Sequence, residues 1–88
     1  MNRVQTLERA RQIVSADRNK EYGEPEDAFK AVAEFWSTYL DQDIHPSDVA
    51  AMMILMKMAR IKANWRHEDS WVDIAGYAAC GAECGDGQ

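Results

Sequence analysis

The chain has 88 residues and a mass of 10.0 kDa, with 47% hydrophobic residues and a formal net charge of −5. A chain of this length buries only about 60% of its unfolded surface, which predicts one domain over residues 1–88 with a thin core. The acidic balance argues against a general surface for nucleic acid or acidic membranes, because both need basic side chains to displace counterions. No apolar run reaches the roughly 18 residues that span a bilayer, and segment 1–11 is too polar for a signal peptide. We therefore expect a cytoplasmic protein.

The first half of the chain predicts two helices. Apolar residues recur at helical spacing over residues 4–14, and this first helix is expected to end near Asp17. Pro25 is typical of a first helical turn, and it begins a second helix with a wide apolar stripe over residues 28–40. This helix is expected to stop in the polar turn at 41–43.

The third predicted helix begins at Pro46 and is apolar on every side over residues 49–61. Three other short helices of one chain can hardly cover such a helix, so we expect it to pack also against another subunit in a homo-oligomer, a dimer or a tetramer. Its methionines would adapt that surface to an imperfect partner. The alternative is a monomer with a methionine-rich core. The methionines of this helix are Met52, Met53, Met56 and Met58.

The fourth predicted helix begins at a capping box, Ser70–Asp73, in which Asp replaces the usual Glu or Gln. Small residues dominate its lower half, 75–82, and predict that a neighbouring helix backbone approaches closely. Cys80 and Cys84 share one face of this helix and are expected to be reduced and partly buried. The segments together predict an all-α bundle of four helices, without strands.

Common catalytic signatures are absent, which leaves little for nucleophilic catalysis. The chain has no Cys-x-x-Cys pair, no His-Glu-x-x-His, no phosphate loop and no Gly-x-Ser-x-Gly. His45 and His67 lie in connections, where we expect them to cap helices or to lie on the surface.

Charged groups on apolar helices are the stronger signal, since a buried charge is costly unless a partner compensates it. Lys57 and Arg60 share one face of the third helix and could act together as a clamp for phosphate oxygens. The carboxylates of Asp48, Asp69 and Asp73 could hold a hydrated Mg²⁺ that bridges to the same phosphates.

A purely structural interpretation is the alternative. In it, Asp48 and Asp73 cap helices, while Lys57 and Arg60 pair with those carboxylates or with Glu34.

Further residues could hold the rest of a nucleotide. The polar loop before Pro25 carries Arg18 and Lys20 for phosphate and Tyr22 for stacking on a base, and Tyr77 of the fourth helix joins this set. Tryptophans offer other stacking surfaces, although core packing is the more common use of such residues. They are Trp36, Trp65 and Trp71.

Several of these residues recur in a pattern that resembles a small family of phage and prophage proteins related to the MazG-like all-α nucleotide pyrophosphohydrolases. The resemblance covers about positions 13–83. Its motifs are Asp17-Arg18-x-x-x-Tyr22-Gly23-x-Pro25, Phe29, Trp36, Asp48-Val49-Ala50, Lys57-x-x-Arg60 and the block from Asp69 to Ala78.

The resemblance implies a four-helix, MazG-like bundle completed by homo-oligomerisation. It also implies Mg²⁺ bound through Glu-x-x-Glu and Glu-x-x-Asp motifs, and cleavage of nucleoside triphosphates to monophosphate and pyrophosphate. Asp48 falls near the first motif and Asp73 at the last position of the second. Met52 and Ser70 stand where further carboxylates would be expected, and fewer carboxylates bind a divalent metal more weakly.

Three functions follow as expectations. The first is Mg²⁺-assisted hydrolysis of a nucleoside triphosphate, in which Lys57 and Arg60 are the catalytic residues that stabilise charge on the phosphates. The second is a phage protein that binds or sequesters a nucleotide without catalysis, with a host immune signal as one possible ligand. The third is a structural helical oligomer whose charges are internal ion pairs.

Overall fold

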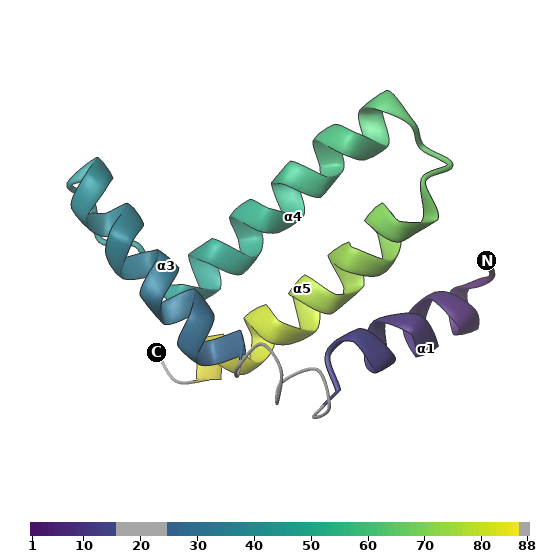
Figure 1. Cartoon of the computed structure of the whole chain (residues 1–88), viewed down its shortest axis with the longest axis horizontal. Helices are drawn as coiled ribbons and strands as arrows, with labels where there is room; N and C mark the ends of the chain where they lie inside the picture. The colour runs from purple at the N-terminus through teal and green to yellow at the C-terminus, as the bar shows by residue number, and fades with distance from the viewer. Residues whose placement is uncertain (16–24, 87–88) are drawn as a thin grey trace.

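The computed structural model describes residues 1–15 and 25–86, and these residues form four helices without a strand (Figure 1). The helices are α1 (Arg3–Ile13), α3 (Pro25–Leu40), α4 (Pro46–Ala63) and α5 (Glu68–Asp86). The expected all-helical class is confirmed for this part of the chain. The predicted nucleotide loop, with Arg18, Lys20 and Tyr22, lies outside the described residues.

The α4 and α5 helices run antiparallel and form the centre of the molecule (Figure 1). Helix α1 lies along α5 on the side away from α4, and α3 crosses the beginning of α4 and projects outward (Figure 1). The radius of gyration is 13.6 Å, whereas a compact domain of this length has about 12 Å. The arrangement is therefore open. None of the described helices is long and apolar enough to cross a membrane.

Local sequence signals set most of the helix ends. Asn2 caps α1, and its side chain and that of Gln5 exchange hydrogen bonds with the backbone as a capping box. Pro25 and Pro46 begin α3 and α4, as predicted. Helix α3 is followed by Asp41 at φ 51°, the left-handed conformation that commonly follows a helix end.

Two expected boundaries are wrong. Helix α1 ends at Ile13 rather than near Asp17, because the chain turns directly after it. Helix α5 begins at Glu68, before the expected capping box, so Ser70 is a fully buried residue inside the helix. Its hydroxyl lies 2.8 Å from Nδ1 of His67, the residue that precedes α5.

The core is thin, as the length predicts. Its largest fully buried side chains are Val49, Val72 and Ser70, and no aromatic ring of the described residues is buried. On α1, the predicted apolar stripe is mostly uncovered: Ala10 is buried, but Val4 and Leu7 are 69% and 64% exposed. The four helices thus leave much apolar surface in water.

Small residues let α4 and α5 approach closely, as expected from the lower half of α5. A Cβ on Gly81 would lie 2.9 Å from the Cβ of Ala50, closer than two such carbons can pack. Next to this contact, Cys80 and Cys84 are both buried and unoxidised. Burial raises the pKa of the Cys80 thiol, and nearby Cys84 and Glu83 add to the effect, so this thiol forms little reactive thiolate.

Replacing Gly81 with alanine tests this contact. We expect Gly81→Ala to destabilise the fold by about 1–3 kcal/mol, because the new methyl group forces α4 and α5 apart. This loss opposes the gain of up to about 1 kcal/mol that alanine brings to a helix. Urea unfolding followed by circular dichroism measures the difference.

Gly85→Ala is the matched control, since a Cβ at Gly85 meets nothing within 4 Å. It should leave stability unchanged or raise it slightly. A Gly81→Ala protein as stable as this control would contradict the close approach.

Candidate functional site

An ion pair joins α4 to α5 near the middle of both helices. Nζ of Lys57 lies 2.8 Å from Oδ2 of Asp73, and the two side chains are 11% and 31% exposed. Lys57 is one of few charged groups in the core, and Asp73 compensates the cost of burying it. This pairing matches the structural interpretation of Lys57. Asp73 lies inside α5, so the expectation that it caps a helix is wrong.

One aromatic side chain lies one turn of α5 from this pair, and a second aromatic ring lies beside the first. Tyr77 follows Asp73 by one turn on the same side of α5. Its ring is 6.2 Å from that of Phe29, at the beginning of α3, and both residues are half-buried. Phe29 belongs to the apolar stripe of α3 and to the motifs of the resemblance, and neither signal predicts that its ring lies near α5. We call Lys57, Asp73, Tyr77 and Phe29 the junction cluster.

Arg60 does not belong to the junction cluster. It lies in the last turn of α4 and is exposed, whereas Lys57 is buried and bound to Asp73. No ion pair of the described residues joins Arg60 to Glu34 or to another carboxylate. The two cations therefore do not form a ready phosphate clamp, because Lys57 already has an anionic partner.

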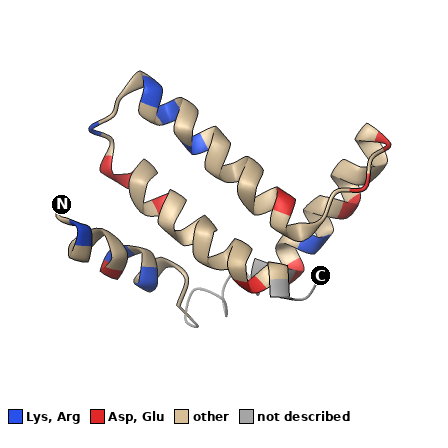
Figure 2. Ribbon diagram, turned by 180° about the vertical axis from the view of Figure 1, so that it is seen from behind, with Lys and Arg blue, Asp and Glu red and all other residues tan. Residues whose placement is uncertain are grey.

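Of the three carboxylates expected to bind metal, Asp48 lies on α4, and Asp69 and Asp73 lie on the antiparallel α5. Acidic positions mark both helices (Figure 2). Measured from the Lys57–Asp73 pair, Asp48 lies about 13 Å along α4, and Asp69 lies about 6 Å along α5 in the opposite direction. Ligands of one Mg²⁺ all lie within about 2.1 Å of the ion. Among the described residues, no three His, Cys, Asp or Glu side chains gather where they could hold a metal. These residues do not fit a Mg²⁺ site within one chain.

Asp48 instead caps α4. Its Oδ2 accepts a hydrogen bond of 2.9 Å from the backbone N–H of His45, the N-cap residue. A carboxylate at this position also interacts favourably with the positive end of the helix dipole. The interpretations of Asp48 as a cap and of His45 as a capping residue are confirmed.

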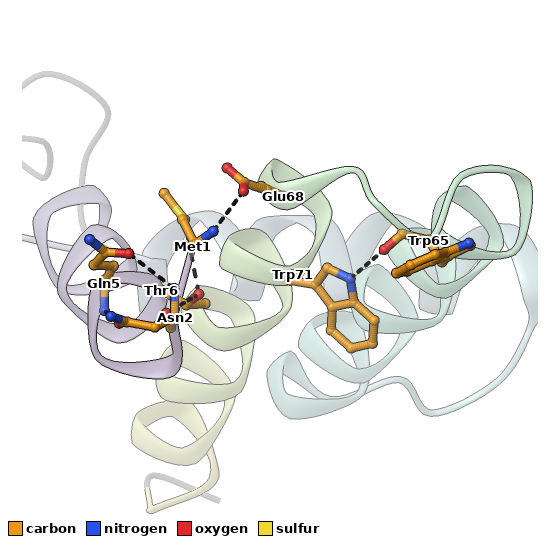
Figure 3. A network of polar contacts seen from close by, with 7 residues as sticks. All are labelled: Met1, Asn2, Gln5, Thr6, Trp65, Glu68 and Trp71. Atoms are coloured by element: carbon orange, nitrogen blue, oxygen red, sulfur yellow. Dashed lines mark hydrogen bonds and ion pairs between the residues drawn. The ribbon is translucent and has the colours of Figure 1, made fainter.

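An exposed aromatic pair joins the turn after α4 to the beginning of α5 (Figure 3). Nε1 of Trp71 donates a 3.0 Å hydrogen bond to the backbone oxygen of Trp65, and the two residues are 46% and 66% exposed. The guanidinium of Arg66 lies 4.9 Å from the centre of the Trp65 ring. Beside this turn, Glu68 pairs with the amino group of Met1 at 2.8 Å (Figure 3). These tryptophans lie outside the junction cluster, and Trp36 is half-buried on α3.

Lys57 is more buried than Asp73, so we expect replacement of the two residues to lower the stability of the fold by different amounts. We expect Asp73→Ala to cost about 2 kcal/mol, because it leaves the buried Lys57 ammonium unpaired. Lys57→Met should cost less than about 1 kcal/mol, because the Asp73 carboxylate left behind is solvated and the methionine stem fills similar space. Denaturant unfolding of both variants measures this order.

Glu83→Ala, an exposed carboxylate of the same helix, is the control and should change stability by less than about 0.5 kcal/mol. If Lys57→Met cost more than Asp73→Ala, burial of the ammonium would not be what makes this pair matter.

Comparison with known proteins identifies relatives of the chain. Two are the Gene 55 proteins of Mycobacterium phages D29 and L5, which are 49% and 41% identical to this chain over 74 and 73 residues. These stretches cover 84% and 82% of this chain but 49% and 47% of the relatives, so the chain spans about half of their length. No solved structure matches the chain.

The family match extends over nearly all of the described helices. Residues 5–85 match the family described as Domain of unknown function (DUF6378), from the first turns of α1 to the end of α5. The junction cluster lies wholly within this match. Together with the two phage relatives, the match shows that the chain belongs to the DUF6378 family, a family with members in bacteriophages.

Proposed function

We propose that this protein binds a nucleotide, or a similar phosphorylated small molecule, at the junction cluster and does so without a metal ion. The observation that carries the proposal is the Lys57–Asp73 pair, which is partly open to solvent and lies one turn of α5 from Tyr77, a half-buried ring that packs near half-buried Phe29. A nucleotide needs such a combination of cation, hydrogen-bond acceptor and apolar ring surface.

The pair retains hydrogen-bonding capacity for a ligand. An ammonium has three N–H donors, and the contact with Asp73 uses one of them. The carboxylate has a second oxygen that can accept from a sugar hydroxyl or a base N–H. Tyr77 supplies a ring face one turn from Asp73, and Phe29 lies beside that ring.

Metal-dependent hydrolysis stays a prediction from the resemblance to the MazG-like superfamily. Asp48, Asp69 and Asp73 would need ligands from elsewhere to complete a metal cage, since they are dispersed along one chain. Binding through the junction cluster has no such requirement, and for that reason we favour binding over cleavage.

The phage relatives suggest how binding alone would be useful. A protein that holds a nucleotide without turning it over lowers the free concentration of that nucleotide, and this is a complete function for a phage inside its host. Arg18, Lys20 and Tyr22, which lie outside the described residues, are the proposed second half of the nucleotide site. Because the relatives are about twice as long, activities of their other half are outside this proposal.

Thermal-shift titration tests the proposal. The full chain is heated with nucleoside mono-, di- and triphosphates and with cyclic dinucleotides, in EDTA and in Mg²⁺. We expect one ligand to raise Tm by about 3 °C or more at saturation in both conditions, because a ligand that binds only the folded state stabilises it.

Lys57→Ala should remove this shift, while Lys30→Ala, an exposed lysine of α3, should keep it. Pyrophosphate release is followed in the same samples. A shift that requires Mg²⁺ and is accompanied by pyrophosphate would favour the hydrolase instead. The absence of any shift across the panel would overturn the proposed binding and leave the pair a structural one.

A further inference from the structure

Helix α4 has two apolar sides, and only one is covered. Its inner side packs on α3 and α5 through buried Val49, Ala50 and Ile61. The opposite side holds Leu55, which is 67% exposed, with Met52 at 39% beside it. Helix α1 lies beyond α5, so nothing among the described helices covers this outer side (Figure 1).

The outer side has a regular order along the helix. Its positions recur every three or four residues. The residue at its centre is seven positions from the charged residue at each end, and seven residues is the repeat of a coiled-coil seam. We call this set the outer stripe. Its members, all exposed, are Asp48, Ala51, Met52, Leu55, Met58, Ala59 and Lys62.

The outer stripe is self-complementary about its centre. Asp48 and Lys62 lie seven residues on either side of Leu55, about 10 Å along the axis in each direction. Ala51 and Ala59 are likewise equidistant from Leu55. If two copies of the stripe pack antiparallel, the acidic end of each lies opposite the basic end of the other. The alanines then lie opposite alanines, and Leu55 lies opposite Leu55 of the second copy.

Such an order is what a two-fold symmetric interface requires, because each contact then occurs twice. We infer that the outer stripe binds the outer stripe of a second copy of this chain, antiparallel, with Leu55 at the two-fold axis and Asp48 facing the partner subunit's Lys62. The alanines allow the two helices to approach closely. The leucine and the methionines become buried against the partner helix and are removed from water.

Charge distribution supports the antiparallel orientation. The only acidic residue of α4 is near its beginning, and its basic residues lie in its second half (Figure 2). A parallel pair would therefore place like charges together. Asp48 has one carboxylate oxygen beyond the one that accepts from His45, and no ion pair of the described residues uses Lys62. Both groups can reach a partner.

The size of the interface predicts a moderate affinity. A stable dimer usually buries about 800 Å² on each partner, and one helical stripe of a few large side chains provides less. We therefore expect a dimer that forms at roughly micromolar to tens of micromolar concentrations and does not depend on a bound nucleotide.

Sedimentation and light scattering of the full chain provide the first test. Between about 5 and 200 µM, the mass should rise from 10.0 kDa toward twice that value. A protein that stays monomeric at the highest concentration, with or without nucleotide, would overturn the inference while leaving the proposed ligand binding untouched.

Exchange of the two charges tests the register. Asp48→Lys and Lys62→Asp should each weaken self-association about tenfold at low salt, since each variant places two repulsive pairs across the axis. An equimolar mixture should recover dimerisation as a heterodimer, because both pairs are then attractive. Circular dichroism of each variant checks the helix, since Asp48→Lys also removes the α4 cap. A mixture as weak as the single variants would refute the pairing of Asp48 with the partner's Lys62.

Cross-linking at the axis tests the geometry independently of charge. Leu55→Cys places two thiols face to face, so copper-catalysed oxidation should give a reducible species of twice the mass. Gln12→Cys, exposed on α1 beyond α5, is the control and should not cross-link at the same rate. The native thiols at Cys80 and Cys84 are buried and contribute little. Equal cross-linking of both variants would contradict a contact centred on Leu55.

Discussion

The close approach of α4 and α5 at Ala50 and Gly81 is the constraint on which the rest of the structure depends. Small residues at this point fix both the separation and the register of the two helices. That register places Lys57 beside Asp73 two turns away, within ion-pair distance. A core of small side chains alone would hold the helices weakly, so the pair adds a directional contact where packing is least specific. Helices α1 and α3 then pack onto a hairpin whose geometry is already set.

The hairpin of α4 and α5 also determines which residues of the candidate site meet. Because α4 and α5 are antiparallel, groups in the middle of both helices meet, whereas groups near their beginnings lie at opposite ends. Lys57, Asp73 and Tyr77 therefore come together, and Asp48 is separated from Asp69. Lys57 of the expected phosphate clamp is paired with Asp73 of the expected metal site, so one group from each set joins the two helices.

Much of the fold could be predicted from the sequence, and the site only in part. Prolines mark the beginnings of α3 and α4 because their missing N–H is tolerated there. The beginning of α5 was misplaced because Ser70 fits a capping pattern, although its hydroxyl contacts His67 from inside the helix. Periodicity identifies an apolar stripe but does not tell which stripe is covered, and the stripe of α1 leaves Val4 and Leu7 exposed. Charge on apolar helices singles out Lys57 and Asp73, but which charged groups meet depends on helix register, which composition and spacing do not contain.

The thin core has a thermodynamic consequence. The heat capacity change of unfolding comes from apolar surface that becomes newly hydrated. In this chain, many large apolar side chains, among them Phe35 and Tyr39 at 74% and 88% exposure, are hydrated before unfolding begins. The isolated chain should therefore have a small heat capacity increment and a broad melting transition. A partner that covers those side chains would therefore raise the stability of the fold and also narrow its melting transition.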